Sequence, residues 1–140
     1  MFKFERQVGR LFECVLVAPL TMKEFEDFRT ACRMGFLAVP GTGVVLTDAT
    51  QLSLLADDVA EQMLDLIKRN NPKIERGAYM VPRRLSSTAM QVTRLFRAAE
   101  TEQRRVFYDK RSVERWLSPV LAPPEIARLR ELLAAIELQT

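Results

Sequence analysis

The sequence predicts an α/β domain in which helices pack on a mixed β-sheet. Strand-like segments alternate with segments whose apolar residues recur at helical spacing, in the order ββαβαβα plus a C-terminal helix. Val44, Val45 and Leu46 form an apolar run without alternation, which indicates a strand covered on both faces. The 140 residues, 48% of them hydrophobic and only five of them glycine, are typical of one packed domain. Right-handed crossovers would make the later strands parallel and leave the N-terminal hairpin strand at or near an edge.

Residues 2–17 predict a β-hairpin, because apolar residues mark two short strands on either side of Gly9, which can form the turn. A helix should follow. Thr21 can cap this helix, and Glu24 three residues later can complete a capping box. Its apolar face comprises Phe25, Phe28 and Cys32. Gly35 suits the C-terminal end of the helix.

A loop at residues 40–43 precedes the buried strand at residues 44–46. The next apolar positions share one face of a helix and are Val59, Met63, Leu66 and Ile67. Residues 70–72, with the sequence Asn-Asn-Pro, end that helix, because the residue before a proline disfavours helical backbone. Residues 74–81 then predict the next strand, which Pro82 stops.

Ser86 or Ser87 can cap another helix, whose apolar face comprises Val92, Leu95, Phe96 and Ala99. Residues 105–108 predict a short strand, and Asp109 can cap the helix that carries Val113, Trp116 and Leu117. Residues 123–125 begin the last helix, since proline is favoured in the first helical turn. The apolar positions of this helix, Ile126, Leu129, Leu132, Leu133 and Ile136, could complete the core of the monomer or pair with a second copy.

Composition limits the classes of protein to which the chain could belong. The apolar runs fall far short of the roughly 20 residues of a membrane span, and the N-terminus lacks the apolar block of a signal peptide. We therefore expect a cytoplasmic protein without a membrane span. The formal charge is +3, and the basic residues are scattered, so we expect no nucleic-acid partner. A basic patch would form only if Arg83, Arg84, Arg94, Arg97, Arg104, Arg105, Lys110 and Arg111 converged.

No catalytic motif is complete. The chain has no histidine, so a serine or cysteine nucleophile would lack its usual base. Cys14 lies in a strand pattern and Cys32 on a helical face, without metal-binding spacing, which predicts two buried free thiols. We expect a non-enzymatic protein with no catalytic residue, no cofactor and no metal. A hydrolase built on the carboxylates of Asp48, Asp57 and Asp58 is the enzymatic alternative.

Two segments resemble a known family. Residues 45–48, Val-Leu-Thr-Asp, followed by a loop and a helix, and residues 105–109, leading to Trp116 and Leu117, resemble the STAS fold of bacterial anti-sigma-factor antagonists. The closer resemblance is to the divergent SpoIIAA-like proteins, and it covers about residues 2–118. It implies a STAS-like domain at residues 1–118 and a C-terminal helical extension at residues 119–140, packed on the same domain or on a partner. It also implies a bacterial regulatory or scaffolding role in signalling.

In phosphorylatable members of that family, an aspartate at the end of a strand leads to an Asp-Ser-Ser-Gly motif at the start of the next helix. Aligned without a gap, Asp48 matches the strand-end aspartate, and residues 56–59 match the motif. Asp57 and Asp58 therefore stand in both serine positions, so we do not expect phosphorylation there. Either they only cap the helix and charge its first turn, or their fixed charge partly mimics a regulatory phosphate.

The predicted partner-binding or regulatory residues lie at this strand-to-helix junction and are Asp48, Thr50, Gln51, Ser53, Asp57 and Asp58. Open α/β sheets tend to bind ligands beyond the carboxyl ends of their strands, which is the position of this junction. The expected partner is a protein, which could also be a second copy in a homodimer. The alternative is a small-ligand or lipid-binding module, because some relatives of this fold carry apolar ligands between the sheet and its helices.

Overall fold

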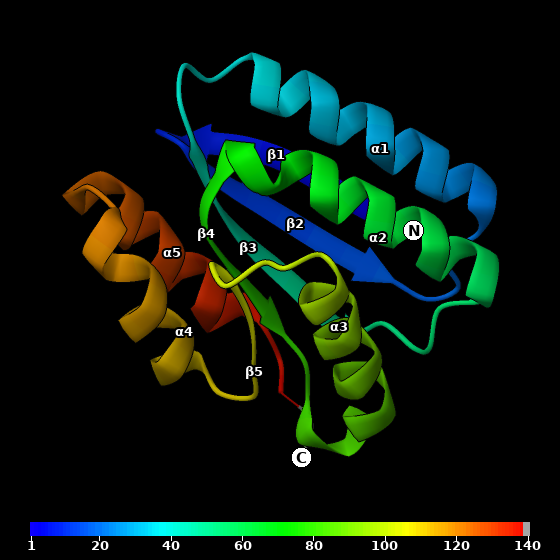
Figure 1. Cartoon of the computed structure of the whole chain (residues 1–140). Helices are drawn as coiled ribbons and strands as arrows, with labels where there is room; N and C mark the ends of the chain where they lie inside the picture. Colours follow the sequence, from blue (N-terminus) through cyan, green and yellow to red (C-terminus); the bar gives the residue numbers. More distant parts are fainter. Residues whose placement is uncertain (139–140) are drawn as a thin grey trace.

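A computed structural model describes residues 1–138 of the chain as a single mixed sheet with helices on both faces (Figure 1). The strands are β1 (Phe2–Val8), β2 (Leu11–Val17), β3 (Gly43–Gln51), β4 (Ile74–Met80) and β5 (Arg104–Phe107), and they lie side by side in that order. β1 pairs antiparallel with β2, and every later neighbouring pair is parallel. The α/β class, the parallel later strands and the edge position of β1 are confirmed.

The helices form two layers. On one face lie α1 (Met22–Leu37), α2 (Asp57–Asn70) and α3 (Ser86–Ala98), and on the other lie α4 (Lys110–Leu117) and α5 (Pro123–Ala135) (Figure 1). Short 3-10 turns occupy Asn71–Lys73, Arg83–Leu85 and Ser118–Val120. No helix within residues 1–138 is both long enough and apolar enough to cross a membrane.

The observed order is ββαβαβαβαα, so the predicted order ββαβαβα plus a C-terminal helix lacks β5 and α4. The local patterns at residues 105–108 and 109–117 predict both elements, and the error lies in the order into which they were assembled. β5 has only four residues and pairs on one side only, with β4, which makes it a weak feature of the sequence.

β3 lies in the middle of the sheet and is buried on both faces, as its apolar run predicts. Val44 and Leu46 belong to the core under α4 and α5, whereas Val45 and Ala49 belong to the core under α1, α2 and α3. The strand extends to Gln51, beyond the predicted residues 44–46, because its polar second half still pairs with β2. Neighbouring strands thus decide its length.

Two of the predicted helix caps are confirmed. The backbone N–H of Glu24 donates to Thr21 Oγ1 at 3.2 Å, and that of Ser112 donates to Asp109 Oδ1 at 2.8 Å. In a complete capping box the Glu24 carboxylate would accept the backbone N–H of Thr21. Here that carboxylate pairs with the amino group of Met1 instead.

The predicted end of α2 at residues 70–72 and the start of α5 at residues 123–125 are confirmed, but two other predicted helix ends are wrong. Leu85 is the N-terminal residue flanking α3, without a side-chain cap, and Ser86 is already helical after the preceding 3-10 turn. Gly35 lies inside α1, where a Cβ would come within 2.8 Å of the Phe4 ring and 3.1 Å of the Phe12 ring. Gly35 therefore serves close helix-to-sheet packing and not a helix stop.

Glu125 joins the start of α5 to the N-terminal hairpin. Its side chain is buried, Oε1 accepts the backbone N–H of Ala122 at 2.7 Å, and Oε2 accepts that of Arg10 at 2.7 Å. Gly9 sits against this carboxylate with φ of +57°, so the predicted hairpin turn is confirmed. One carboxylate thus satisfies a helix start and a turn that are 115 residues apart.

A buried ion pair fixes the middle of α5 to the sheet. Glu13 on β2 is 3% exposed, and Arg128 donates to both of its carboxylate oxygens, at 2.9 Å from Nε and 2.8 Å from Nη2. This bidentate contact raises the pKa of Arg128 above its ordinary value. Leu129 and Leu133 beside it are buried in the same core as Leu11 and Val44. The described part of the C-terminal segment thus packs on the sheet of its own chain.

We expect Arg128→Ala to lower the free energy of unfolding clearly, because the Glu13 carboxylate would remain buried without its partner. The matched control is Arg130→Ala on the same helix, since Arg130 pairs with Glu114 at the exposed surface and its loss should cost less than about 1 kcal/mol. Urea unfolding measures both. Equal effects of the two substitutions would show that Glu13 does not depend on Arg128.

Candidate functional site

The six residues predicted for the junction do not form one cluster. Asp48 is half-buried on the face covered by α5, where it lines a hollow with Leu132 and Ile136. Its Oδ1 accepts the backbone N–H of Thr50 at 3.0 Å and the Thr50 hydroxyl at 2.6 Å. Asp48 and the buried Thr50 therefore satisfy each other.

The other four residues, Gln51, Ser53, Asp57 and Asp58, are exposed. Asp57 and Asp58 occupy the first turn of α2, as predicted, but neither caps the helix. The N-cap is Ala56, and Asp58 Oδ1 accepts the backbone N–H of the next residue, Val59, at 2.9 Å. The prediction that an aspartate caps the helix is wrong, because the N-cap position falls one residue earlier, at Ala56. The prediction that both aspartates place negative charge in the first turn is confirmed.

The loop between β3 and α2 is fixed in place by α3. The side-chain oxygen of Gln91 accepts the backbone N–H of Leu55 at 2.9 Å, and its Nε2 donates to the carbonyl of Leu55 at 3.0 Å. Leu52 and Leu55 are buried, whereas Leu54 is 58% exposed. The loop therefore presents one large apolar side chain at the surface, shortly before the acidic start of α2 in the sequence.

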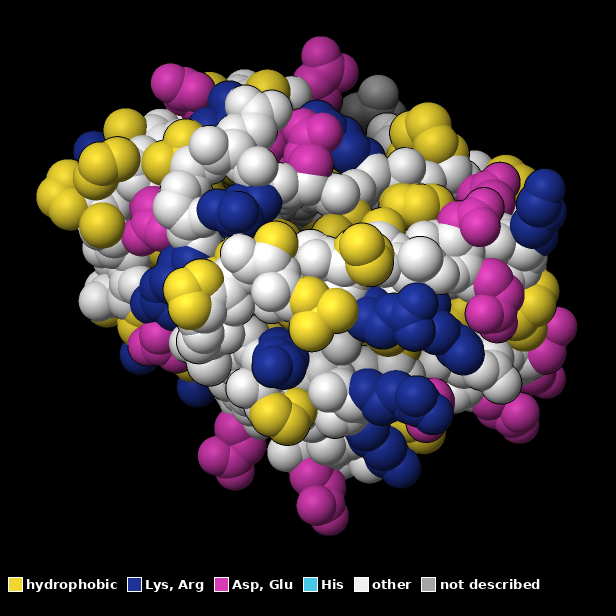
Figure 2. Space-filling model, turned by 90° about the horizontal axis from the view of Figure 1, so that it is seen from above, with side chains coloured by type: hydrophobic (Ala, Val, Ile, Leu, Met, Phe, Trp, Pro, Cys, Tyr) yellow, Lys and Arg dark blue, Asp and Glu magenta, His cyan; other side chains and the backbone are white. Residues whose placement is uncertain are grey.

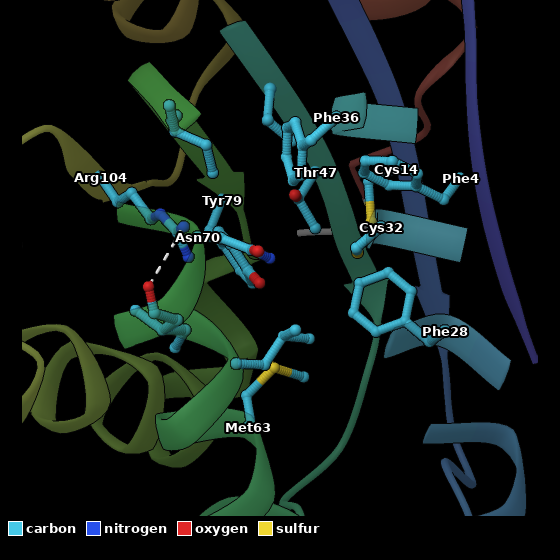
Figure 3. A pocket seen from close by; sticks show the side chains of 15 residues that line it. Phe4, Cys14, Phe28, Cys32, Phe36, Thr47, Met63, Asn70, Tyr79 and Arg104 are labelled. Carbon is cyan, nitrogen blue, oxygen red and sulfur yellow. Dashed lines mark hydrogen bonds between the residues drawn. The ribbon is translucent and has the colours of Figure 1, made fainter. Parts of the chain in front are cut away.

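A cavity of about 30 Å³ lies between the sheet and helices α1 and α2 (Figure 3). Its apolar walls include Phe4, Phe28, Phe36, Met63 and Leu66. Polar side chains also line it, namely Cys14, Cys32, Thr47, Asn70, Tyr79 and Arg104. Figure 3 shows these groups arriving from several strands and both helices. The ligand-binding alternative expects a site between the sheet and its helices, but no local pattern identifies these residues, because they lie up to 100 residues apart.

Arg104 is the charged group of this cavity. It is 7% exposed, and its Nη2 donates to the carbonyl of Ile67 at 3.5 Å, at the outer limit of a hydrogen bond. Burial lowers the pKa of this guanidinium. Period-2 alternation could have revealed its position, since Arg104 shares a face of β5 with Val106, which packs against the core.

The other titratable groups of the cavity are neutral at physiological pH. Burial raises the pKa of the Cys14 thiol to about 12 and also raises the pKa values of Cys32 and Tyr79. Both cysteines are buried free thiols, as predicted. Neither thiol has the lowered pKa of a nucleophile.

A surface groove of about 410 Å³ adjoins the cavity between α1 and α2, since Phe36, Leu66 and Asn70 line both. Its cationic side chains are Arg29, Arg33, Arg69 and Lys73. Figure 2 looks onto this face and shows Lys and Arg side chains across it, with most acidic side chains toward its periphery. Arg29 donates to Gln62 at 2.5 Å and so connects the two helices.

The basic residues considered for a patch separate in the structure. Arg104 is buried, whereas Arg105 stacks on the opposite side of β5, with its guanidinium carbon 3.9 Å from the centre of the Trp116 ring. Arg83 lies over the ring of Tyr108 instead. Arg104 therefore belongs to no surface patch with Arg105, and the groove cations are a different set.

We expect both thiols to resist DTNB in the native protein at pH 8 and to react in guanidinium chloride, because burial removes access and raises both pKa values. Absorbance at the thiolate band of the released product counts the reactive groups. A Cys14→Ala variant assigns the remaining reaction to Cys32. Rapid native reaction would mean that the cavity opens freely to reagents of this size.

No protein-family model matches the chain, and no curated protein or solved structure shows significant similarity to it. The resemblance to STAS and SpoIIAA-like proteins therefore remains a prediction from the residues that carry it.

Proposed function

We propose that this protein is a non-enzymatic small-ligand-binding module that holds its ligand between the sheet and helices α1 and α2. The observation that carries this proposal is the combination of a small cavity, in which apolar walls surround a few polar groups, with a groove of about 410 Å³ that shares three of its lining residues. In this proposal the ligand extends past the shared lining residues Phe36, Leu66 and Asn70 into the adjoining groove, because the cavity itself holds little more than a water-sized volume. Of the two functions expected from the sequence, the ligand-binding alternative thus gains the stronger geometric support.

We expect 1-hexanol, an apolar chain without a charge, to raise the melting temperature of the protein by binding the folded state. Cys32→Met should abolish the shift by filling the cavity from α1, whereas Cys32→Ala at the same position leaves more space and should preserve it. Differential scanning fluorimetry measures the shifts. Native mass spectrometry of the purified protein would show any retained ligand, and an unshifted melting temperature would count against the proposal.

A second candidate function is protein binding at the junction, favoured by Leu54. This exposed apolar side chain sits on a loop fixed by Gln91, three and four residues before Asp57 and Asp58 in the sequence. A rigid apolar anchor next to charged groups suits a protein contact. If the resemblance to STAS proteins holds, the partner is a bacterial regulatory protein. Asp57 and Asp58 would then carry a fixed negative charge where relatives carry a regulated phosphate.

Under this second function, Asp58→Ser and Leu54→Ser should lower recovery of a partner from extracts of the source organism at least several-fold. The melting temperature should change little, since an exposed first-turn charge contributes about 0.3–1 kcal/mol. Glu61→Ser, an exposed acidic position on the same helix, is the matched control. Unchanged recovery with a lowered melting temperature would assign Asp58 a purely structural role.

A further inference from the structure

The buried guanidinium of Arg104 lacks the partner that such a group ordinarily has. No Asp or Glu within residues 1–138 forms an ion pair with it, and its Nε has no hydrogen-bond partner there. The one carbonyl that it reaches, that of Ile67, already accepts the backbone N–H of Asn71. Buried charges are normally paired, because removing a charge from water is unfavourable. Glu13 and Arg128 in this chain follow that rule, and Arg104 departs from it.

The backbone holds Arg104 in this position. Arg104 pairs in register with Gly77 on β4, and a Cβ at Gly77 would lie 3.3 Å from Arg104 Cγ. The missing side chain leaves the arginine stem room to cross the sheet toward α2. Figure 3 shows the guanidinium directed into the cavity beside Tyr79 and Asn70. The charge of Arg104 therefore lies in the cavity and not in the solvent around β5.

The charge balance of the cavity defines a complementary ligand. Its fifteen lining residues include one cation and no carboxylate, and burial keeps the thiols and the Tyr79 hydroxyl protonated. A monoanion would neutralise the cavity, whereas a dianion would leave a charge without a partner. A carboxylate also matches the planar fork of a guanidinium, and it would offer an acceptor to Nε.

We propose that Arg104 receives the carboxylate of an apolar monocarboxylic acid bound in this cavity, which rests on the ligand-binding function proposed above. The carboxylate lies deep, against Arg104, and the hydrocarbon chain follows Phe36 and Leu66 toward the groove. Arg33 and Lys73, which line the groove, raise the local concentration of anions at its mouth, whereas Arg69 already pairs with Asp65. Arg104 thus determines which class of ligand binds, and the aromatic walls determine how apolar its body is.

The test compares hexanoate with 1-hexanol, which share a chain and differ in the charged group. Wild-type protein should bind hexanoate about tenfold more tightly or better, since hydrogen bonds between charged groups are the stronger ones. Arg104→Met, which keeps the length of the stem, should bind the two equally. Arg105→Met is the matched control, because the neighbouring arginine stacks on Trp116 outside the cavity and its loss should leave the preference intact.

Titration calorimetry measures the affinities, and the wild-type comparison alone remains decisive if Arg104→Met fails to fold. Arg104→Lys, which keeps the charge, provides a second variant that should retain part of the preference. Equal wild-type affinity for the acid and the alcohol would overturn the role of Arg104 while leaving the ligand-binding function standing. Absence of binding for both would overturn the function itself.

Discussion

Burial of β3 on both faces is the constraint from which the rest of the structure follows. A strand without a solvent face needs apolar cover above and below, and α1, α2 and α3 supply it on one side. On the other side α4 is only eight residues long, so α5 must complete the layer. The Glu13–Arg128 pair and the Glu125 carboxylate tie this late helix to the earliest strands of the chain. The C-terminal segment is thereby part of the core that holds β3.

The two helix layers differ in whether the buried charge that each covers has an ion-pair partner. Under α5 the buried carboxylate of Glu13 meets a bidentate arginine, so that layer is electrostatically satisfied. Under α1 and α2 the sheet carries Arg104 without a carboxylate among the described residues, beside thiols and a phenol kept neutral by burial. In the proposed function a bound monoanion partners this charge, and its binding to the folded state would also stabilise the protein. This contrast within one sheet is what distinguishes the cavity from ordinary packing.

The strand-to-helix junction has a narrower role than its sequence indicates. β3 runs through Asp48 to Gln51, and its pleat turns Asp48 toward α5 while Thr47 faces the cavity. The aspartates of α2 and Leu54 are exposed at the surface. One stretch of sequence therefore contributes to the cavity, to the hollow under α5 and to the surface. Of these three, only the surface suits a protein contact.

The sequence by itself determined the α/β class, the hairpin, the double burial of β3, the Thr21 and Asp109 caps and the two free thiols. Each depends on periodicity, on residues a few positions apart or on composition, which a linear pattern records. Tertiary structure decided the role of Gly35, the division of the junction residues and the cavity around Arg104. Those outcomes depend on which distant side chains meet across the sheet, such as Gly77 beside Arg104. No local pattern carries that register, because parallel pairing joins strands separated by whole helices.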